Sequence, residues 1–180
     1  MTEFIEQLNN PKTKTYLEFK QHVLSGMFEW YWFESVDNEN TPKYDKEKYT
    51  NISFYSHGFL MRPNNHLKYP FSTSQYTETA STIFQEILKY NGVHINSFLR
   101  IGANCVHPQP NSGVVSSIPH FDHSFPHKNV LIYLTDAGGD TYVMDKSHSP
   151  VEDDVILFEG EHYMQTPLEK RRIVLVATFV

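Results

Sequence analysis

The chain has 180 residues, a length that fits one globular domain and leaves little room for two. Aromatic residues make up 14% of it and charged residues 20%, a composition that fills a core and excludes intrinsic disorder. The net charge of −6 argues against a general nucleic-acid or anionic-membrane binder, and no apolar run approaches the roughly 20 residues of a membrane span. The single cysteine, Cys105, excludes a disulfide framework and a cysteine-based zinc site, and it fits a reducing cytosol.

The first 94 residues are expected to be helical and irregular. A first helix of about three turns is predicted from apolar side chains at three- and four-residue spacing: Tyr16, Phe19, Val23 and Met27. A second helix is predicted between residues 74 and 91, where one face is apolar and an Asn-Gly pair ends the pattern. The polar stretch 37–51 between them has the composition of a solvated loop.

After residue 95 the pattern changes to short β-rich runs separated by turn residues, which predicts a sandwich or barrel. The last run, RRIVLVATFV, is apolar on both faces, so we expect both of its sides to be covered. The predicted fold is therefore mainly β with N-terminal helices: a double-stranded β-helix (jelly roll) core braced by helices on one sheet. We expect a single domain over residues 1–180, in which 1–94 form a helical and irregular support and 95–180 the β-core with a metal site.

Ten histidines are the one unusual count, and they direct attention to the segment PHFDHSFPH. Residues i and i+2 of a strand point to the same side, so His120 and Asp122 would present an imidazole and a carboxylate to one space. His162, after the run VILF and a short turn, is the best candidate for a third ligand. Two histidines and one carboxylate favour a non-heme Fe(II) oxygenase site, although the ligand types alone leave a tetrahedral zinc site open.

Four segments carry a resemblance to a known family, and they occur in that family's order: PHFDH, NVLIYLTDAGGDTYV, SPVEDDVILFEGEHYMQTP and RRIVLVATFV. From about residue 98 the chain resembles the 2-oxoglutarate- and Fe(II)-dependent dioxygenases, in particular the prolyl-4-hydroxylase-like group. Two upstream stretches, LSGMFEWYWFES and SFYSHGFL, more loosely resemble short phage-encoded members. The resemblance implies that His120, Asp122 and His162 are the iron ligands.

The same resemblance implies a site for the cosubstrate 2-oxoglutarate. Both Arg171 and Arg172 stand near the expected distance from the distal histidine, and strand alternation lets only one face the cavity. Arg172 is the better match, and a guanidinium suits the far carboxylate of 2-oxoglutarate because it forms two parallel hydrogen bonds. Tyr133 is expected to help hold that carboxylate, and Asn104 to line the cosubstrate pocket.

The activity implied by the resemblance is hydroxylation of a C–H bond in a protein side chain or a small molecule, with release of succinate and CO2. The cofactors would be Fe(II) and 2-oxoglutarate, with ascorbate as a reductant. The partners would be O2, 2-oxoglutarate and an unidentified substrate, without a membrane; the acidic charge argues against nucleic acid but leaves it open. The location would be the cytoplasm, that of the host if the chain is phage-encoded. Segments 37–51 and 63–75 are candidate lids.

Two other functions remain open at this point. One is a cupin-like site that uses zinc or manganese without 2-oxoglutarate. The other is a binding or sensor module whose iron site does not turn over. The further histidines of the motif, His123 and His127, are expected to line the mouth of the site or a loop, because Pro126 argues against a helix there.

Overall fold

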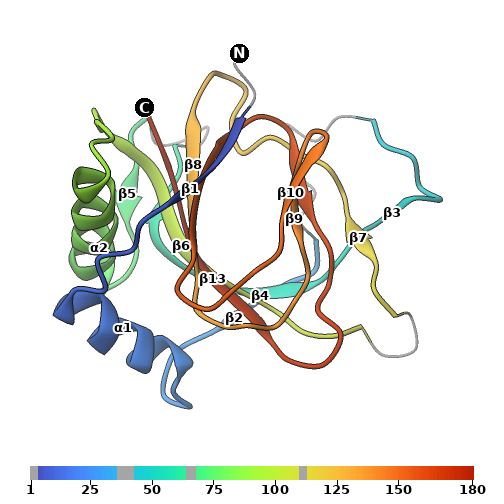
Figure 1. The fold of residues 1–180 in the computed structure, drawn as a ribbon, viewed down its shortest axis with the longest axis horizontal. Helices are drawn as coiled ribbons and strands as arrows, with labels where there is room; N and C mark the ends of the chain where they lie inside the picture. Colours follow the sequence, from blue (N-terminus) through green and yellow to red (C-terminus); the bar gives the residue numbers. More distant parts are fainter. Residues whose placement is uncertain (1–3, 36–42, 64–67, 110–112) are drawn as a thin grey trace.

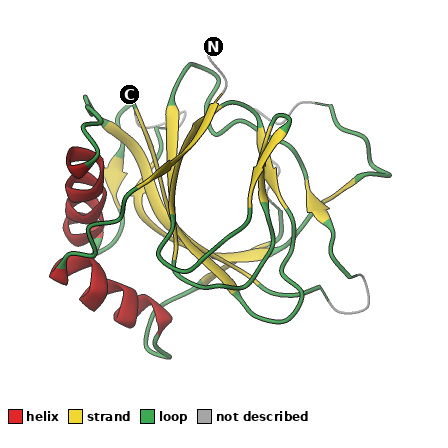
Figure 2. Ribbon diagram, in the orientation of Figure 1, coloured by secondary structure: helices red, strands yellow, loops and turns green. Residues whose placement is uncertain are grey.

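The computed structural model describes residues 4–35, 43–63, 68–109 and 113–180. Two β-sheets face each other, and two helices pack on the outer face of the larger sheet (Figures 1 and 2). This arrangement confirms the predicted jelly roll braced by helices on one sheet. Over the described ranges, neither helix is both long and apolar enough to cross a bilayer.

The larger sheet is antiparallel throughout. Its strands are β1 (Phe4–Leu8), β2 (Tyr31–Phe33), β4 (Phe54–Met61), β5 (Phe71–Ser72), β6 (Phe98–Val106), β8 (Lys128–Tyr133), β11 (Val155–Glu159) and β13 (Arg172–Phe179). They follow the order β1-β11-β8-β13-β6-β4-β2, with β5 paired to β4. Strand β13, the last in the chain, therefore lies in the middle of the sheet.

The smaller sheet closes the other side of the roll. Its strands are β9 (Thr141–Val143), β10 (Lys146–His148) and β12 (His162–Met164), in the order β10-β9-β12. A parallel pair, β3 (Tyr49–Thr50) and β7 (Ser116–Ser117), lies beyond β12 and joins it through an isolated bridge between Ser116 and Gln165. The two sheets enclose the space in which the predicted site residues meet.

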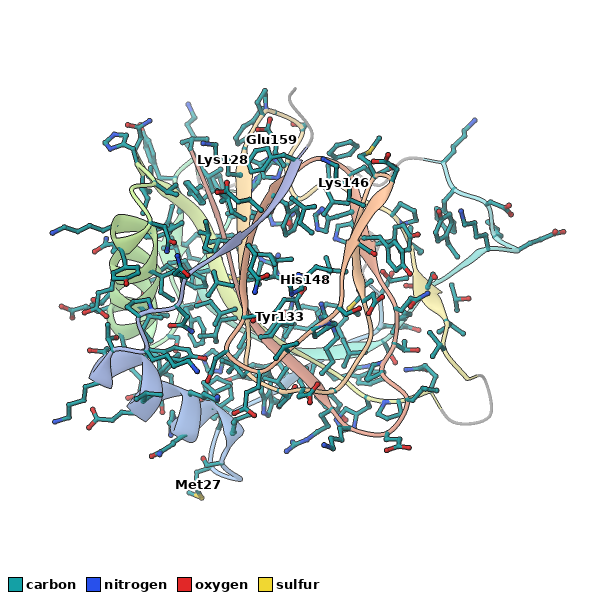
Figure 3. The ribbon with its side chains drawn as sticks, in the orientation of Figure 1. Met27, Lys128, Tyr133, Lys146, His148 and Glu159 are labelled. Atoms are coloured by element: carbon teal, nitrogen blue, oxygen red, sulfur yellow. The ribbon has the colours of Figure 1, made fainter. Side chains whose placement is uncertain are left out.

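Both predicted helices are confirmed. Helix α1 (Lys14–Leu24) begins after Thr13, whose hydroxyl accepts a hydrogen bond from a backbone N–H of the first turn, the usual role of an N-cap. It ends before Met27, which is 83% exposed and points away from the fold (Figure 3). Helix α2 (Thr77–Tyr90) buries one apolar face, which includes Ile83 and Phe84, against the larger sheet.

Strand β13 is covered on both faces, as its composition predicts. All eight of its residues are buried. Ile173 and Leu175 belong to the core between the sheet and the helices, whereas Val174 and Val176 belong to a second apolar cluster between the two sheets. Because alternate residues of a strand point to opposite faces, the even-numbered residues of β13 face the interior of the roll.

The N-terminal half contains more strand than the sequence predicted. Strands β1, β2 and β4 all belong to the larger sheet, so residues 1–94 are not only helical and irregular. The apolar alternation of β4 is broken by polar residues and by a register shift between Gly58 and Leu60, and the strand is recognisable only from its pairing with β6. Within the candidate lids, residues 49–50 form β3 and 71–72 form β5, while 36–42 and 64–67 lie outside the described residues.

Candidate metal and cosubstrate site

A cavity of about 520 Å³ lies between the two sheets. Its floor is the inner face of β6 and β13, whose register pairs Arg100 with Thr178, Gly102 with Val176, Asn104 with Val174, and Val106 with Arg172. Gly102 lines the middle of this floor without a side chain. Its backbone lies close to β4, because a Cβ at this position would come within 3.2 Å of the carbonyl oxygen of His57. Arg100 and Arg172 thus stand at opposite ends of one surface.

His120 and His162 face each other across a short antiparallel bridge. Their backbones exchange two hydrogen bonds of 3.0 and 3.1 Å, and their ring centroids are 4.5 Å apart. Each ring has its Nδ1 next to a backbone carbonyl oxygen, that of Ile118 at 3.0 Å for His120 and that of Gly160 at 3.2 Å for His162. A carbonyl can only accept, so Nδ1 carries the proton and Nε2 is left as the ligand atom of each ring.

Asp122 completes the group that the sequence predicted. Its Oδ2 lies 3.5 Å from Nε2 of His162, and its Oδ1 accepts hydrogen bonds of 3.0 Å from both Arg62 and Arg100. Burial by itself would raise the pKa of this carboxyl, but the positive charges of Arg100 and Arg62 hold the pKa well below its usual range. Asp122 is therefore ionised at neutral pH although it is 3% exposed.

The same surroundings keep His162 neutral. Burial, with a smaller contribution from His120, lowers the pKa of His162 to about 4. A neutral imidazole is the form that binds a metal, because protonation of Nε2 removes the lone pair. No proton has to be displaced from this ring at neutral pH.

The donor atoms of the three predicted ligands stand slightly too far apart for a bound metal. Metal–ligand distances of about 2.1 Å place neighbouring octahedral ligands about 3 Å apart, a little closer than Asp122 and His162 stand. In the part of the chain that the structure describes, no three His, Cys, Asp or Glu side chains are arranged closely enough to hold a metal ion as they stand. His120, Asp122 and His162 have the donor atoms of a metal site and line the same cavity. Metal binding would require their donor atoms to move closer together than they stand here.

Arg172, not Arg171, faces the cavity. Arg172 is 2% exposed, whereas Arg171 is exposed at the surface. The guanidinium donates from Nε to the carbonyl oxygen of Gly139 at 3.0 Å and from Nη2 to Oγ1 of Thr141 at 2.7 Å. Gly139 has φ +80°, and a Cβ there would come within 2.5 Å of the carbonyl oxygen of Gln165. The Gly-Gly-Asp-Thr turn therefore holds this arginine with neutral partners only.

Tyr133 packs beside this arginine. Its hydroxyl lies 2.7 Å from Oγ1 of Thr141, and Cζ of Arg172 lies 5.3 Å from the centroid of its ring. His148 stacks on the ring at 5.4 Å, so the tyrosine is fixed between the two sheets (Figure 3). Burial raises the pKa of Tyr133, which keeps the hydroxyl protonated and able to donate. Thr141 thus connects the two residues that were predicted to hold 2-oxoglutarate.

Asn104 lines the cavity one step along the floor from Arg172. Its Oδ1 accepts a hydrogen bond of 2.8 Å from the hydroxyl of Ser56 on β4. The amide NH2 group of Asn104 is consequently the end that can donate to a ligand. All six residues predicted for the site are thus brought to one region between the sheets, and their functional roles remain predictions.

Sequence reasoning missed Arg62, Arg100 and Thr141. Arg100 carries a usable signal, because it stands four residues before Asn104 in one strand and must share its face. Thr141 lies in the segment NVLIYLTDAGGDTYV, which was quoted for the resemblance without a role for the threonine. Arg62 gives no signal in the sequence, since its position depends on the register shift in β4.

The two neighbouring histidines are buried behind the site. His123 and His127 lie in the loop that precedes β8, as one of the predicted alternatives has it, but each is 7% exposed, so neither lines an open mouth. Nε2 of His123 lies 2.8 Å from Oγ1 of Thr178, and Nδ1 of His127 lies 2.8 Å from the carbonyl oxygen of Phe125. Neither ring joins the group formed by the predicted ligands.

Comparison with solved structures identifies the fold. The structure matches an oxidoreductase of the 2OG-Fe(II) oxygenase family from Burkholderia pseudomallei with a TM-score of 0.61 and 11% identity, over 97% of this chain and 84% of the other. It matches a prolyl hydroxylase from Trichoplax adhaerens, solved with a hypoxia inducible factor peptide fragment, with a TM-score of 0.56 and 15% identity, over 99% and 84%. The non-heme alpha ketoglutarate dependent epimerase SnoN from nogalamycin biosynthesis matches with a TM-score of 0.58 and 11% identity, over 99% and 78%.

No protein-family model matches the sequence, and no curated protein sequence matches it. The resemblance inferred from the sequence is thus confirmed for the fold: the chain has the architecture of the 2-oxoglutarate/Fe(II) oxygenases, prolyl hydroxylases among them. Identities of 11–15% establish that architecture alone. Function has to be argued from the side chains in the cavity.

Proposed function

We propose that this protein is a non-heme Fe(II)- and 2-oxoglutarate-dependent dioxygenase that hydroxylates a C–H bond of a protein side chain or a small molecule. The observation that carries the proposal is that His120, Asp122, His162 and Arg172 all line one cavity of about 520 Å³. Three of them are the ligand types of a facial iron site, and the fourth is a buried cation that forms no ion pair with a carboxylate of the described residues.

In this proposal His120, Asp122 and His162 hold the metal. The backbone carbonyls on Nδ1 of the two imidazoles fix their orientation and tautomer, and the low pKa of Asp122 keeps the carboxylate charged. When bound with 2-oxoglutarate, the metal supplies O2 activation, so that the substrate gains a hydroxyl group while 2-oxoglutarate and O2 yield succinate and CO2. Ascorbate would serve to keep the metal reduced.

Arg172, Tyr133 and Asn104 hold the cosubstrate. Arg172 is 2% exposed, and its printed hydrogen bonds go to a carbonyl and a threonine hydroxyl. Among the described residues no carboxylate forms an ion pair with it, although Asp140 is close enough to act on its charge. The far carboxylate of 2-oxoglutarate would provide the direct counter-charge. The Asn104 amide lines the same surface as a further donor, and the Tyr133 hydroxyl lies just behind it, at 2.7 Å from the lining residue Thr141. Val174 of β13 pairs with Asn104 on β6 and with Tyr133 on β8. Its apolar side chain would exclude water from this part of the cavity.

The metal assignment is tested by titrating the apoprotein with Mn(II), a redox-inert substitute for Fe(II). His162→Ala should lose stoichiometric binding, because two ligands hold a metal weakly. His123→Ala is the matched control: this ring is buried nearby but bonds to Thr178, so binding should stay near normal. The reverse result would show that the ligands are wrongly chosen.

The activity is tested by succinate formation from 2-oxoglutarate in the presence of Fe(II), ascorbate and fractions of a cell lysate. The proposal requires succinate that depends on both Fe(II) and 2-oxoglutarate. Metal binding without 2-oxoglutarate binding would indicate the cupin-like alternative. Binding of both, with no succinate across all fractions, would indicate a sensor module; either outcome contradicts the proposal.

A further inference from the structure

The cavity carries an excess of positive charge. Its ionised lining side chains, among the residues the structure describes, are three arginines and one carboxylate: Arg62, Arg100, Arg172 and Asp122. In the proposed function, Arg172 is matched by the far carboxylate of 2-oxoglutarate. Fe(II) and 2-oxoglutarate carry equal and opposite charges, so binding both leaves the excess unchanged. Arg62 and Arg100 then have one carboxylate between them, that of Asp122, which in the proposed function is also a metal ligand.

These two arginines lie at the end of the cavity that 2-oxoglutarate does not occupy in the proposed function. Arg100 pairs with Thr178 at one end of the β6–β13 ladder, and Arg172 pairs with Val106 at the other. The rise of a β-strand puts the Cα atoms of these two rungs about 20 Å apart. Arg62 follows β4, where the register shift after Gly58 brings it to the same end as Arg100.

The guanidinium groups keep free donors in the cavity. Arg62 donates to the backbone oxygen of Asp122 at 2.6 Å and to its Oδ1 at 3.0 Å, and Arg100 makes one bond to the same Oδ1. Each guanidinium has five N–H groups, and most of them have no hydrogen-bond partner among the described residues. The two side chains are 29% and 19% exposed, which is enough to contact a ligand.

The adjoining part of the cavity is apolar. Val176 pairs with Gly102 on one side and with Leu131 on the other, and both apolar side chains line the cavity. Met61, the last residue of β4, also lines it and directly precedes Arg62. A ligand bound to the arginines would place its carbon skeleton over this rung.

We propose that Arg62 and Arg100 form a second anion-binding position, and that the substrate carries a carboxylate or phosphate group on an apolar body. This inference rests on the proposed function and names the class of its substrate. The anionic group would contact the two guanidinium groups beside Asp122, while Met61, Leu131 and Val176 contact the carbon skeleton that bears the reacting C–H bond.

The test is calorimetric and needs no turnover. The protein is loaded with Mn(II) and saturating 2-oxoglutarate, which occupies Arg172, and is titrated with hexanoate, hexyl phosphate or hexanamide. At least one anion should bind about 10-fold more tightly than the neutral amide, as expected for a charge-assisted hydrogen bond. Whether hexanoate or hexyl phosphate binds better distinguishes a carboxylate from a phosphate.

Variants locate the binding position. Arg62→Gln should weaken the preferred anion about 10-fold and leave hexanamide unchanged, whereas the surface control Arg171→Gln should change neither. Because Arg62 contacts Asp122, Mn(II) affinity is measured for each variant. If Arg62→Gln loses Mn(II), Arg100→Gln decides, because it removes the other proposed cation: with Mn(II) retained, a weakened anion supports the proposal and an unweakened one overturns it.

The outcomes separate this inference from the proposed function. If the wild-type protein binds neither Mn(II) nor 2-oxoglutarate, the proposed function is wrong and the substrate inference is withdrawn with it. If it binds both but does not prefer the anions to hexanamide, only the substrate class is wrong. Displacement of the anion by rising 2-oxoglutarate would show that it had bound at Arg172, which also overturns the second position.

Discussion

Replacing Arg172 by alanine is the sharpest test of the cosubstrate site, because its neighbour in the chain provides the control. The two arginines are adjacent, yet strand alternation buries Arg172 at 2% exposure inside the roll and leaves Arg171 at the surface. Arg172→Ala removes the only cation at this end of the described cavity lining, whereas Arg171→Ala removes the same charge from solvent.

The expected magnitude follows from the contacts. Hydrogen bonds to charged groups contribute about 1.5–3 kcal/mol, which corresponds to roughly 10- to 100-fold in the dissociation constant of 2-oxoglutarate. Thr141 keeps its bond to Tyr133 when the guanidinium is removed, so the variant loses a charge without stranding that hydroxyl. Arg171→Ala should change the constant less than twofold.

The assay is calorimetric titration of the Mn(II)-loaded protein with 2-oxoglutarate, after thermal unfolding has shown that each variant is folded. An equal loss for both variants would mean that general charge, not position, controls binding. A loss for Arg171→Ala alone would show that the register of β13 is wrong by one residue. A loss below threefold for Arg172→Ala would refute the assignment of the far carboxylate to this residue.

Three further substitutions test the surroundings of the site. Thr141→Val keeps the shape but removes the oxygen that holds Arg172, so 2-oxoglutarate affinity should fall by roughly 3- to 10-fold in the same titration. Gly139→Ala should lower the free energy of unfolding in urea by about 1–3 kcal/mol, because φ is +80° and the new Cβ would meet the carbonyl oxygen of Gln165. Burial alone would raise the pKa of Asp153, but hydrogen bonds from a lysine and a tyrosine of α1 lower the pKa to about 2. Its stabilising effect is complete above the unfolded value of 3.8 and is lost as the pH falls through 2. Asp153→Asn should therefore cost about 1–2 kcal/mol at pH 7, and the difference from wild type should shrink between pH 4 and pH 2.

Local patterns in the sequence were sufficient to predict the helices and the last strand, whose apolar residues follow a regular spacing. The spacing of apolar residues located α1 and α2, and the two-sided apolar run at the end of the chain predicted a central strand. These signals are reliable because helix and strand periodicities are properties of the segment itself. Strand β4 and the aromatic strand β2 were missed, because their stability comes from pairing with distant strands and not from their own pattern.

The candidate site divides in the same way. The alternation that separates Arg171 from Arg172 is local, so the sequence alone indicated it. His120 and Asp122 do reach one space, but not as residues of a strand, because His120 forms only an isolated bridge and Asp122 lies in a bend. The cytoplasmic location, the phage relationship and the lids at 37–51 and 63–75 remain predictions. The contacts of Asp122 with Arg62 and Arg100 were not predictable, since they join residues 60 and 22 positions away from it.

The sequence by itself determined which residue types are present and, in a strand with a regular pattern such as β13, which of them share a face. Only the tertiary structure decided that two extra guanidinium groups converge on the predicted aspartate, and that a threonine of the Gly-Gly-Asp-Thr turn joins the predicted arginine to the predicted tyrosine. The physical reason is that a strand fixes the direction of its side chains through its own backbone, whereas strand register and order depend on the packing of the whole chain. The excess of three arginines over one carboxylate in the described cavity lining results from that packing, and the proposed anionic substrate is inferred from this excess.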